Sequence, residues 1–290
     1  MKYMNSKDVA LIMGVNVSTI KRWTDAHQLP CYQTPGGHRK FTLGHINEFL
    51  KKNKKKIKKV NLLELKGLTD KELIHNVEHG DFSKLNSIFF KAAIEADQNK
   101  ISTIITGLYL KGVELENIYD NLVFPVMHSI GELWEKGKLT IPEEHLASEV
   151  VRKAIYELGE SLNIDISDDG PSAICFGLAG DEHELPLIMA KQILELNGIR
   201  AYNLGRSIPV ISIVNLLKKV QANFLIISAN YQKSTNLVIE ELTELIGLIR
   251  HKKIKLLIGG NASILAKQKF GNMIGVIDNM KDLKQNILFN

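Results

Sequence analysis

The 290-residue chain has few cysteines and no long apolar run, and both features narrow what it can be. Its two cysteines, Cys31 and Cys175, lie far apart and form no CxxC cluster, which argues against a disulfide framework and a zinc site. No apolar run approaches the roughly 18 residues of a membrane span, and the N-terminus has no signal-peptide hydrophobic region. We therefore expect a soluble, cytoplasmic protein with two or three domains.

The charge of the chain is unevenly distributed. Residues 1–60 contain 13 lysines and arginines and 3 acidic residues, whereas the remainder contains 24 and 29. A small basic part on a mildly acidic remainder indicates a polyanionic partner, most simply double-stranded DNA. The lysine-rich run from Lys51 to Lys59 is typical of a solvated linker that adds a sequence-independent contribution to DNA binding.

Residues 1–60 have the pattern of a winged helix-turn-helix domain. Short helices are expected over residues 6–13, capped by Ser6, and over residues 17–25, with a glycine turn between them. A turn at residues 34–37 precedes basic residues suited to phosphate contact from a β-wing. Trp23 has the helical spacing of a core residue. The candidate DNA-binding residues are Ser18, Lys21 and Arg22 on the second helix and His38, Arg39 and Lys40 on the wing.

Residues 18–23 and 36–41 resemble the recognition-helix and wing patterns of the MerR family of winged helix-turn-helix regulators. The resemblance covers about 50 residues and implies operator DNA as a partner. The alternative is a generic small helical domain with a solvated basic face. Many MerR relatives dimerise through a long coiled-coil helix, but no sustained heptad follows here. Any oligomer is therefore expected to be built by the rest of the chain.

Residues 66–163 are helical by their periodicity. Helices are expected over residues 70–79, 82–96, 98–112 and 115–136, and from Thr140 onward, where a capping box begins. Short loops between them predict an antiparallel bundle. Trp134 near the end of one helix is followed, after nine residues, by Glu144 and His145 in the next, so all three side chains can gather at one end of the bundle. In the alternative, Glu144 merely favours the helix dipole beside a surface histidine.

Residues 170–290 alternate between strand and helix patterns. Strands are expected at about 173–178, 201–204, 223–229, 255–259 and 274–277. This alternation predicts a parallel sheet with helices on both faces, flavodoxin-like or Rossmann-like, in which ligands bind at the carboxyl ends of the strands. Asp181, Glu182 and His183 follow the first strand. A histidine with a carboxylate two residues before it is a candidate metal ligand with its orienting partner.

The loops after three of these strands resemble the cobalamin-binding signature Asp-x-His-x-x-Gly, Ser-x-Leu and Gly-Gly. In this chain 41 residues separate Pro186 from Ser228, and 28 separate Asn230 from Gly259. Two positions depart from the signature, because Pro186 stands where the family has glycine and Asn230 where it commonly has leucine. Proline is tolerated in the first turn of a helix, so the loop is expected to stay intact.

The resemblance implies that His183 is the lower axial ligand of cobalt and that Asp181 accepts its other ring N–H. It also implies that the glycines allow the nucleotide tail of the cofactor to approach the sheet closely. The alternative is a domain that has kept the fold and binds no cobalamin. The candidate cofactor-binding residues are Trp134, Glu144, His145, Asp181, Glu182, His183, Ser228, Asn230, Gly259, Gly260 and Asn261.

The order of the three parts, together with Trp134, nine residues, and Glu144-His145, is similar to that of the CarH/LitR light-sensing repressors. It divides the chain at residues 1–60, 61–165 and 170–290. The resemblance implies a repressor without enzymatic turnover that uses adenosylcobalamin as its chromophore. Trp134 and Glu144 pack around the adenosyl group in that family, and His145 corresponds to the residue that can bind cobalt after light cleaves the Co–C bond.

By the same resemblance, a tetramer holds operator DNA in the dark and falls apart in light, which removes multivalent DNA contact. Two alternatives stay open. One is a light-independent regulator that senses cobalamin, and the other is a corrinoid component of a methyltransferase or mutase system. The basic N-terminal part argues against the second of these, because carbon transfer has no use for a DNA-binding domain.

Overall fold

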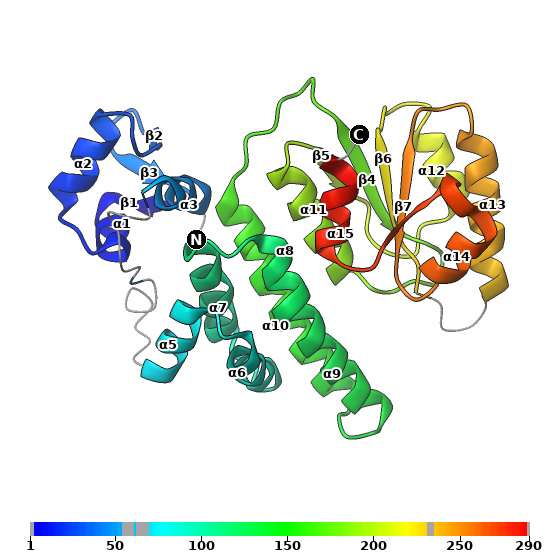
Figure 1. Ribbon diagram of the computed structural model, residues 1–290, viewed down its shortest axis with the longest axis horizontal. Helices are drawn as coiled ribbons and strands as arrows, with labels where there is room; N and C mark the ends of the chain where they lie inside the picture. Colours follow the sequence, from blue (N-terminus) through cyan, green and yellow to red (C-terminus); the bar gives the residue numbers. More distant parts are fainter. Residues whose placement is uncertain (1–2, 54–60, 62–69, 231–234, 289–290) are drawn as a thin grey trace. The chain divides into compact units, whose positions relative to one another are not determined.

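The computed structural model describes residues 3–53, 61, 70–230 and 235–288, and the chain divides into two compact units, Met1–Asn163 and Ile164–Asn290 (Figure 1). Most of the lysine-rich run, residues 54–59, lies outside the described residues. Within the described residues, no helix has both the length and the apolar character needed to cross a membrane.

The first unit begins with the winged helix-turn-helix head that the sequence predicts. It contains helices α1 (Ser6–Met13), α2 (Val17–Asp25) and α3 (Leu43–Lys52), and an antiparallel sheet in the order β1 (Met4–Asn5), β3 (Arg39–Phe41), β2 (Tyr32–Gln33). The prediction that Ser6 caps α1 was wrong. Asn5 is the N-cap, since its side chain accepts from the backbone of Asp8 while the Asp8 carboxylate accepts from the backbone of Asn5.

Packing inside the head agrees with the predicted core. The ring of Trp23 lies 4.8 Å from that of Phe49, centroid to centroid, so Trp23 joins α2 to α3. Lys51 and Lys52 belong to the last turn of α3 and are therefore not linker residues. Basic residues at a helix C-terminus interact favourably with the helix dipole.

The rest of the first unit is the predicted helical bundle. Its helices are α5 (Lys71–His79), α6 (Phe82–Ile94), α7 (Gln98–Leu110), α8 (Leu115–Ile118), α9 (Phe124–Glu135) and α10 (Ile141–Leu162). The helix expected over residues 115–136 is interrupted by a π-helical segment, Tyr119–Val123, with Tyr119 fully buried. The predicted capping box of α10 is confirmed, because Thr140 and Glu143 cap each other and Pro142 lies in the first turn.

The second unit is the predicted α/β domain. Its five parallel strands are β4 (Ser172–Gly177), β5 (Arg200–Asn203), β6 (Phe224–Ser228), β7 (Lys255–Gly259) and β8 (Gly275–Ile277), in the order β5-β4-β6-β7-β8. This is the flavodoxin-like order, in which the chain reverses direction across the sheet between the first and third strands, β4 and β6.

Helices cover both faces of this sheet (Figure 1). On one face lie α11 (Leu185–Leu196) and α15 (Met280–Leu288), and on the other α12 (Val210–Leu216), α13 (Thr235–Ile249) and α14 (Ser263–Phe270). Ile174, Phe176, Leu225 and Ile227 pack with residues of the second group in one buried core. Strands buried on both faces read as continuous apolar runs, which is why the sequence located them within one or two residues.

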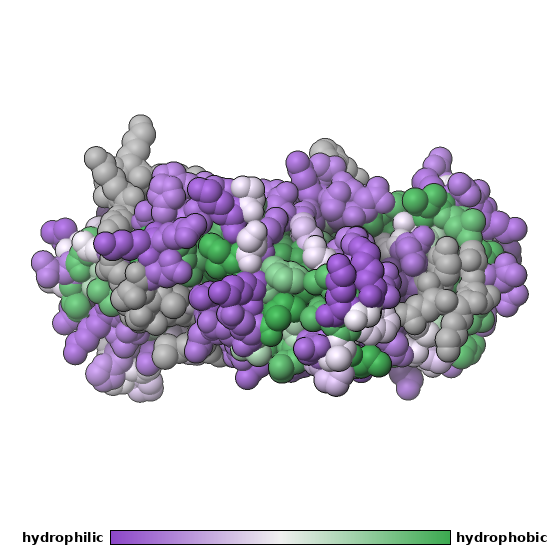
Figure 2. Space-filling view, turned by 90° about the horizontal axis from the view of Figure 1, so that it is seen from below, coloured by the Kyte–Doolittle hydropathy of each residue, from purple (hydrophilic) through white to green (hydrophobic). Residues whose placement is uncertain are grey.

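Hydrophobic side chains also reach the surface. Figure 2 shows hydrophobic residues gathered near the centre of that view among hydrophilic neighbours. Around the turn between α9 and α10, the exposed large hydrophobic residues are Trp134, Ile141 and Leu146, with relative exposures of 40%, 55% and 52%. Exposed apolar groups that gather at one end of a bundle indicate a surface that binds something.

Candidate functional site

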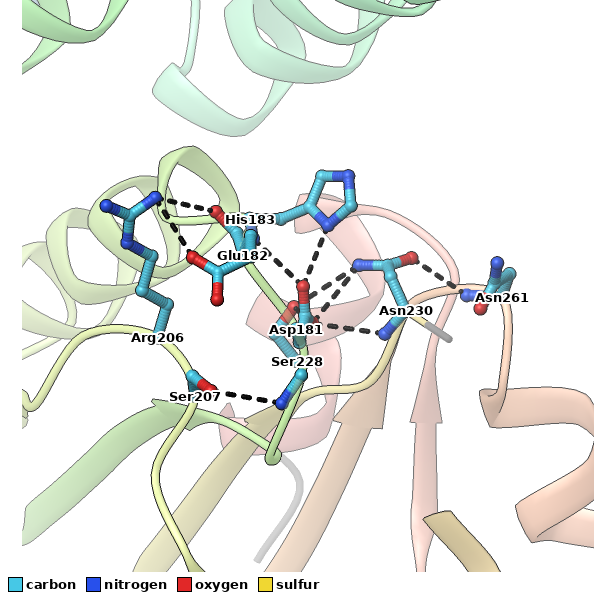
Figure 3. Close-up of polar contacts among 9 residues, drawn as sticks. Asp181, Glu182, His183, Arg206, Ser207, Ser228, Asn230 and Asn261 are labelled. Atoms are coloured by element: carbon cyan, nitrogen blue, oxygen red, sulfur yellow. Dashed lines mark hydrogen bonds and ion pairs between the residues drawn. The ribbon is translucent and has the colours of Figure 1, made fainter. Parts of the chain in front are cut away.

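The carboxylate of Asp181 is the centre of the predicted site. It is only 2% exposed and lies in the loop after β4, at the carboxyl edge of the sheet. Its Oδ2 accepts from Ser228 Oγ at 2.6 Å and from the Asn230 backbone N–H at 3.0 Å, and its Oδ1 accepts from the His183 backbone N–H at 2.9 Å (Figure 3). One hydroxyl and two backbone N–H groups thus hold one buried carboxylate in place.

The protonation state of Asp181 follows from these contacts. Burial acts to raise the pKa of this carboxyl, but the hydrogen bonds from His183, Ser228 and Asn230 outweigh it, so the pKa lies below its usual value. Asp181 is therefore a buried anion at neutral pH. A buried anion is a strong acceptor for an imidazole N–H.

His183 is oriented by that anion. Its Nδ1 lies 2.7 Å from Asp181 Oδ1, and its side chain is 51% exposed, with the ring pointing away from the sheet in Figure 3. Donation from Nδ1–H fixes the tautomer in which Nε2 carries the lone pair. Metal-binding histidines are held in this way, because a carboxylate on one ring nitrogen raises the basicity of the other.

Ser228 is the last residue of the adjacent strand β6, and Asn230 lies in the loop that follows it. Both donate to Asp181, and the side-chain Oδ1 of Asn230 accepts from the backbone N–H of Asn261 at 3.1 Å. Asparagine in place of the leucine of the signature therefore has a local role. It ties the loop after β6 to the loop after β7.

Two supporting contacts were not predicted from the sequence, although Gly205, Arg206 and Ser207 follow the second predicted strand at the ligand-binding edge of the sheet. Ser207, at φ +55°, donates its backbone N–H to the Asp181 carbonyl oxygen, and its Oγ accepts from the Gly180 N–H at 3.0 Å. Glu241 on α13 accepts from the Ala179 N–H at 3.3 Å. Burial raises the pKa of Glu241. No local sequence pattern predicts either contact, since the two partners of each hydrogen bond lie 27 and 62 residues apart in the chain.

Glu182 lies beside the site without joining the Asp181 network. It is exposed, and its Oε2 pairs with Arg206 at 3.2 Å. Pro186 occupies the first turn of α11, whose N-cap is Glu184, so the substitution of proline for glycine leaves the loop and the helix intact. This agrees with the expectation drawn from the sequence.

The paired glycines after β7 are required by the chain itself. A Cβ on Gly260, at φ +99°, would lie 2.6 Å from the Ala229 carbonyl oxygen, and one on Gly259 would lie 3.2 Å from the Ile277 carbonyl oxygen. The close approach of neighbouring loops therefore accounts for both glycines. The part they take in approaching a cofactor stays a prediction.

Replacing Gly260 with alanine is expected to destabilise the second unit. A positive φ and a clash with backbone together cost about 2 kcal/mol or more. The matched control is Gly247→Ala in α13, where an added Cβ meets nothing within 4 Å and helix propensity improves by about 1 kcal/mol. Thermal unfolding should show Tm falling for the first variant and rising or holding for the second. Equal Tm values would contradict the steric argument.

The three residues predicted for an upper cofactor face lie together at one end of the bundle. Trp134 is in the last turn of α9, and Glu144 and His145 are in the first turn of α10. Glu144 Oε2 lies 3.5 Å from His145 Nε2, and its Oε1 accepts from Ser148. The His145 side chain is 73% exposed. These residues belong to the first unit, and Asp181 and His183 belong to the second.

The predicted DNA-binding residues differ in their surroundings. Ser18, Lys21, Arg22 and His38 are exposed, as phosphate-contacting or base-contacting residues must be. Lys40 is half-buried in β3. Arg39 is engaged within the head, since its Nη2 lies 2.5 Å from Asp25 at the end of α2 and its side chain is only 18% exposed. Arg39 thus joins the wing to α2, a role that the sequence analysis did not anticipate.

The donor set of the site fits cobalamin. One half-exposed imidazole, held by a buried carboxylate at the point where the chain reverses across the sheet, suits a metal whose other positions are filled by its own macrocycle. Among the described residues, no group of three or more His, Cys, Asp and Glu side chains is arranged to hold a metal ion. His183 would therefore be the protein's ligand from this unit.

Comparisons with known proteins agree with this arrangement. The family model described as a helix-turn-helix domain matches residues 3–54, and that described as a B12 binding domain matches residues 85–158. The HTH-type transcriptional repressor CarH of Myxococcus xanthus is 28% identical over 155 residues, which are 53% of this chain and 50% of that protein. The chain thus matches about half the length of CarH.

Corrinoid proteins are also similar. Dimethylamine corrinoid protein 1 of Methanosarcina mazei is 25% identical over 168 residues, covering 56% of this chain and 74% of that protein. The structure of the monomethylamine corrinoid protein of Methanosarcina barkeri superposes with a TM-score of 0.58 at 17% identity, over 71% of this chain and 98% of its own. That likeness concerns the fold of the bundle and the α/β domain.

Fold and matches together give the organisation of the chain: a helix-turn-helix head, a helix bundle that matches a B12 binding domain, and a five-stranded parallel α/β domain. With the head included, the chain is similar to the HTH-type transcriptional repressor CarH.

Proposed function

We propose that the protein is a cobalamin-dependent transcriptional repressor whose DNA binding responds to light. The observation that carries the proposal is the His183–Asp181 pair, with its 2.7 Å hydrogen bond, in a chain that also has a DNA-binding head. The identity to CarH and the match to a B12 binding domain support cobalamin binding and transcriptional regulation. The adenosyl form, the light response and a dark tetramer are the further steps of the proposal.

In this proposal each part of the site has one task. His183 Nε2 would hold cobalt, and Asp181 would orient the imidazole ring and stabilise positive charge on it. Trp134, Glu144 and His145, at the end of α9 and the start of α10, would be the bundle residues that respond to the cofactor. When bound, adenosylcobalamin supplies a cobalt–carbon bond that visible light can break.

The output follows from multivalency. Several heads held in one oligomer bind DNA far more tightly than one head, because the second contact is made at a high effective concentration. Rearrangement of the apolar surface around Trp134 would remove an interface and release the heads. The net basic charge of residues 1–60 supplies the sequence-independent part of the affinity.

The test uses purified protein loaded separately with adenosylcobalamin and methylcobalamin. We expect a dark oligomer that holds duplex DNA, and a smaller, weakly binding species after green light, on a sizing column and in a DNA-retention assay. If the cofactor binds but the oligomer and DNA affinity are equal before and after light, the light response is wrong and a light-independent cobalamin sensor remains. Uptake of the methyl form alone would overturn the adenosyl assignment.

Replacing His145 with alanine is expected to spare dark binding and to change the absorption spectrum after illumination. The reason is its position: the side chain is 73% exposed at the bundle end and supports no core contact. His128→Ala, an equally exposed histidine on α9, is the matched control. Identical spectra of the illuminated His145→Ala variant and the wild type would remove His145 from the mechanism.

The second candidate function is a corrinoid carrier protein for methyl transfer, favoured by the similarity to the dimethylamine corrinoid proteins. This function would use the bundle and the α/β domain, but it would leave the basic DNA-binding head without a function. Specific retention of duplex DNA by the cobalamin-loaded protein would favour the repressor. Transfer of a methyl group from a methylamine to the bound, reduced corrinoid by an added methyltransferase, with release of the amine and without DNA binding, would favour the carrier.

A further inference from the structure

The head and the bundle of the first unit meet along one side of α3. Gly44, Asn47 and Lys51 recur at helical spacing and so lie on the same face of that helix, which packs against α7 and α10. We define these three residues, with the groups they contact on the bundle, as the α3 seam.

The contacts of the α3 seam are of three kinds. A Cβ on Gly44 would lie 3.0 Å from the Leu162 carbonyl oxygen, so helix and backbone approach closely there. The Asn47 side chain, 3% exposed, hydrogen-bonds with the Tyr109 hydroxyl, and burial raises the pKa of that tyrosine. Lys51 Nζ lies 2.8 Å from Glu114 Oε1.

A fourth contact joins the wing itself to α10. Asn163, the left-handed C-cap of α10, donates from Nδ2 to the Tyr32 hydroxyl in β2 at 3.2 Å. The Tyr32 ring packs on His45 of α3, with centroids 5.0 Å apart. The C-terminal end of α10 therefore contacts both the wing strand and, through Leu162, the α3 helix.

The same helix carries the proposed upper cofactor face at its other end. Glu144 and His145 lie in the first turn of α10, which runs for 22 residues without interruption, a length of about 33 Å. A continuous helix transmits a shift of one end to the other with little loss. The exposed DNA-binding candidates Lys21 and Arg22 lie on α2, and no contact of the seam involves them.

We propose that α10 and the α3 seam form a direct mechanical link from the cofactor face to the DNA-binding head. This inference rests on the proposed function, because it takes the first turn of α10 as the part that responds to the cofactor. It goes beyond disassembly of an oligomer, since it makes the affinity of a single head for DNA depend on the state of the bundle.

The contacts of the α3 seam are weak enough to be broken and re-formed. Asn47 Oδ1 is buried and has no hydrogen-bond partner within the described part of the chain, and the outer contact is an exposed ion pair. Native cores satisfy nearly all buried polar atoms, so an unsatisfied one marks an interface that is less than optimally stable. Two docked states of the head can then differ little in free energy, as a switch requires.

The test is the affinity of the cobalamin-loaded protein for a short duplex with one half-site, selected with the wild type, in the dark and after green light. One half-site removes multivalency. We expect the wild type to change its Kd by about fivefold or more, the lower end of ordinary allosteric coupling. Gly44→Val, which inserts a side chain against Leu162, should reduce the change to less than about twofold without altering the cobalamin spectrum.

A series of charge reversals tests the α3 seam independently, in case the Gly44→Val variant does not fold. Lys51→Glu and Glu114→Lys should each weaken the light-dependent change, and the double variant should recover it. Lys52→Glu is the matched control, because it reverses the same charge on the same helix, and within the described part of the chain Lys52 pairs with Glu48 of that helix. Hydrogen exchange of residues 43–52 should rise in Gly44→Val and not in Lys52→Glu.

The outcomes separate the two proposals. A protein that takes up no cobalamin contradicts the proposed function, as its spectrum shows before any DNA is added. Uptake with an unchanged half-site Kd in wild type after light, or an unchanged light response in the seam variants, overturns the link through α10. Unchanged hydrogen exchange in Gly44→Val would overturn the seam itself.

Discussion

Replacing His183 with alanine is expected to reduce cobalamin affinity by more than about 100-fold. Removing only the partner that orients a metal-bound histidine costs about 10- to 100-fold, and here the ligand itself is lost. The variant should fold normally, because the side chain is 51% exposed and Asp181 keeps its bonds to Ser228 and Asn230. Titration of the variant with cobalamin, followed by absorbance, measures the loss.

The control for His183→Ala is His251→Ala. His251 is exposed in the same domain, in the loop that precedes β7, whereas His183 follows β4. The two histidines therefore lie toward opposite edges of the parallel sheet. We expect His251→Ala to bind cobalamin with wild-type affinity. Wild-type affinity and spectrum for His183→Ala as well would remove His183 as the cobalt ligand.

The double substitution Lys21→Ala, Arg22→Ala is expected to weaken DNA binding by about tenfold or more. A base-reading arginine contributes about 1–3 kcal/mol, and each lost phosphate contact lowers the slope of log K against log salt by about 0.9. Both side chains are exposed on α2, and the head core, formed by residues such as Ile20 and Phe49, stays intact. Binding measured at several salt concentrations gives both quantities.

The matched control removes two lysines from the bundle, with Lys84→Ala and Lys91→Ala on α6. Net charge then falls equally in both proteins. If the two double variants bind DNA alike, the effect is general electrostatics and α2 is not the recognition helix. Arg39→Ala should behave differently from either, with a lower Tm for the head, because it breaks the pair with Asp25 that holds the wing to α2.

The sequence predicted the elements of the fold well because their signals are local. Five apolar runs located the strands, and the capping box at Thr140 located the start of α10. The π-helical segment at Tyr119 left no such signal, and in the structure the Tyr119 ring is fully buried there. Ser6 was chosen as a cap although Asn5, the actual cap, is an equally suitable residue one position earlier.

Contacts between distant segments account for what the sequence did not reveal. Asp181, His183 and Ser228 were predicted from their resemblance to the cobalamin-binding signature, and the structure brings them within hydrogen-bonding distance. Glu241 and Ser207 support the same loop through single backbone bonds, a role open to many residue types and therefore invisible in a pattern. No sequence pattern predicted the packing of α3 against the bundle either.

The substitutions at Pro186 and Asn230 also become intelligible from the structure. Pro186 lies at a position where a proline loses no helical hydrogen bond. The Asn230 side chain adds a donor to Asp181, from Nδ2 at 3.4 Å, and an acceptor for the loop after β7. The chain thus departs from the cobalamin signature at two positions while keeping the buried anion and the oriented imidazole.

The most direct test of the account is the visible spectrum of the purified protein after incubation with adenosylcobalamin in the dark and removal of free cofactor. We predict a red protein with about one cobalamin per chain, and a spectrum that His183→Ala changes, because in the proposed function the His183 imidazole would hold cobalt. A colourless protein would contradict the central claim that this chain binds cobalamin.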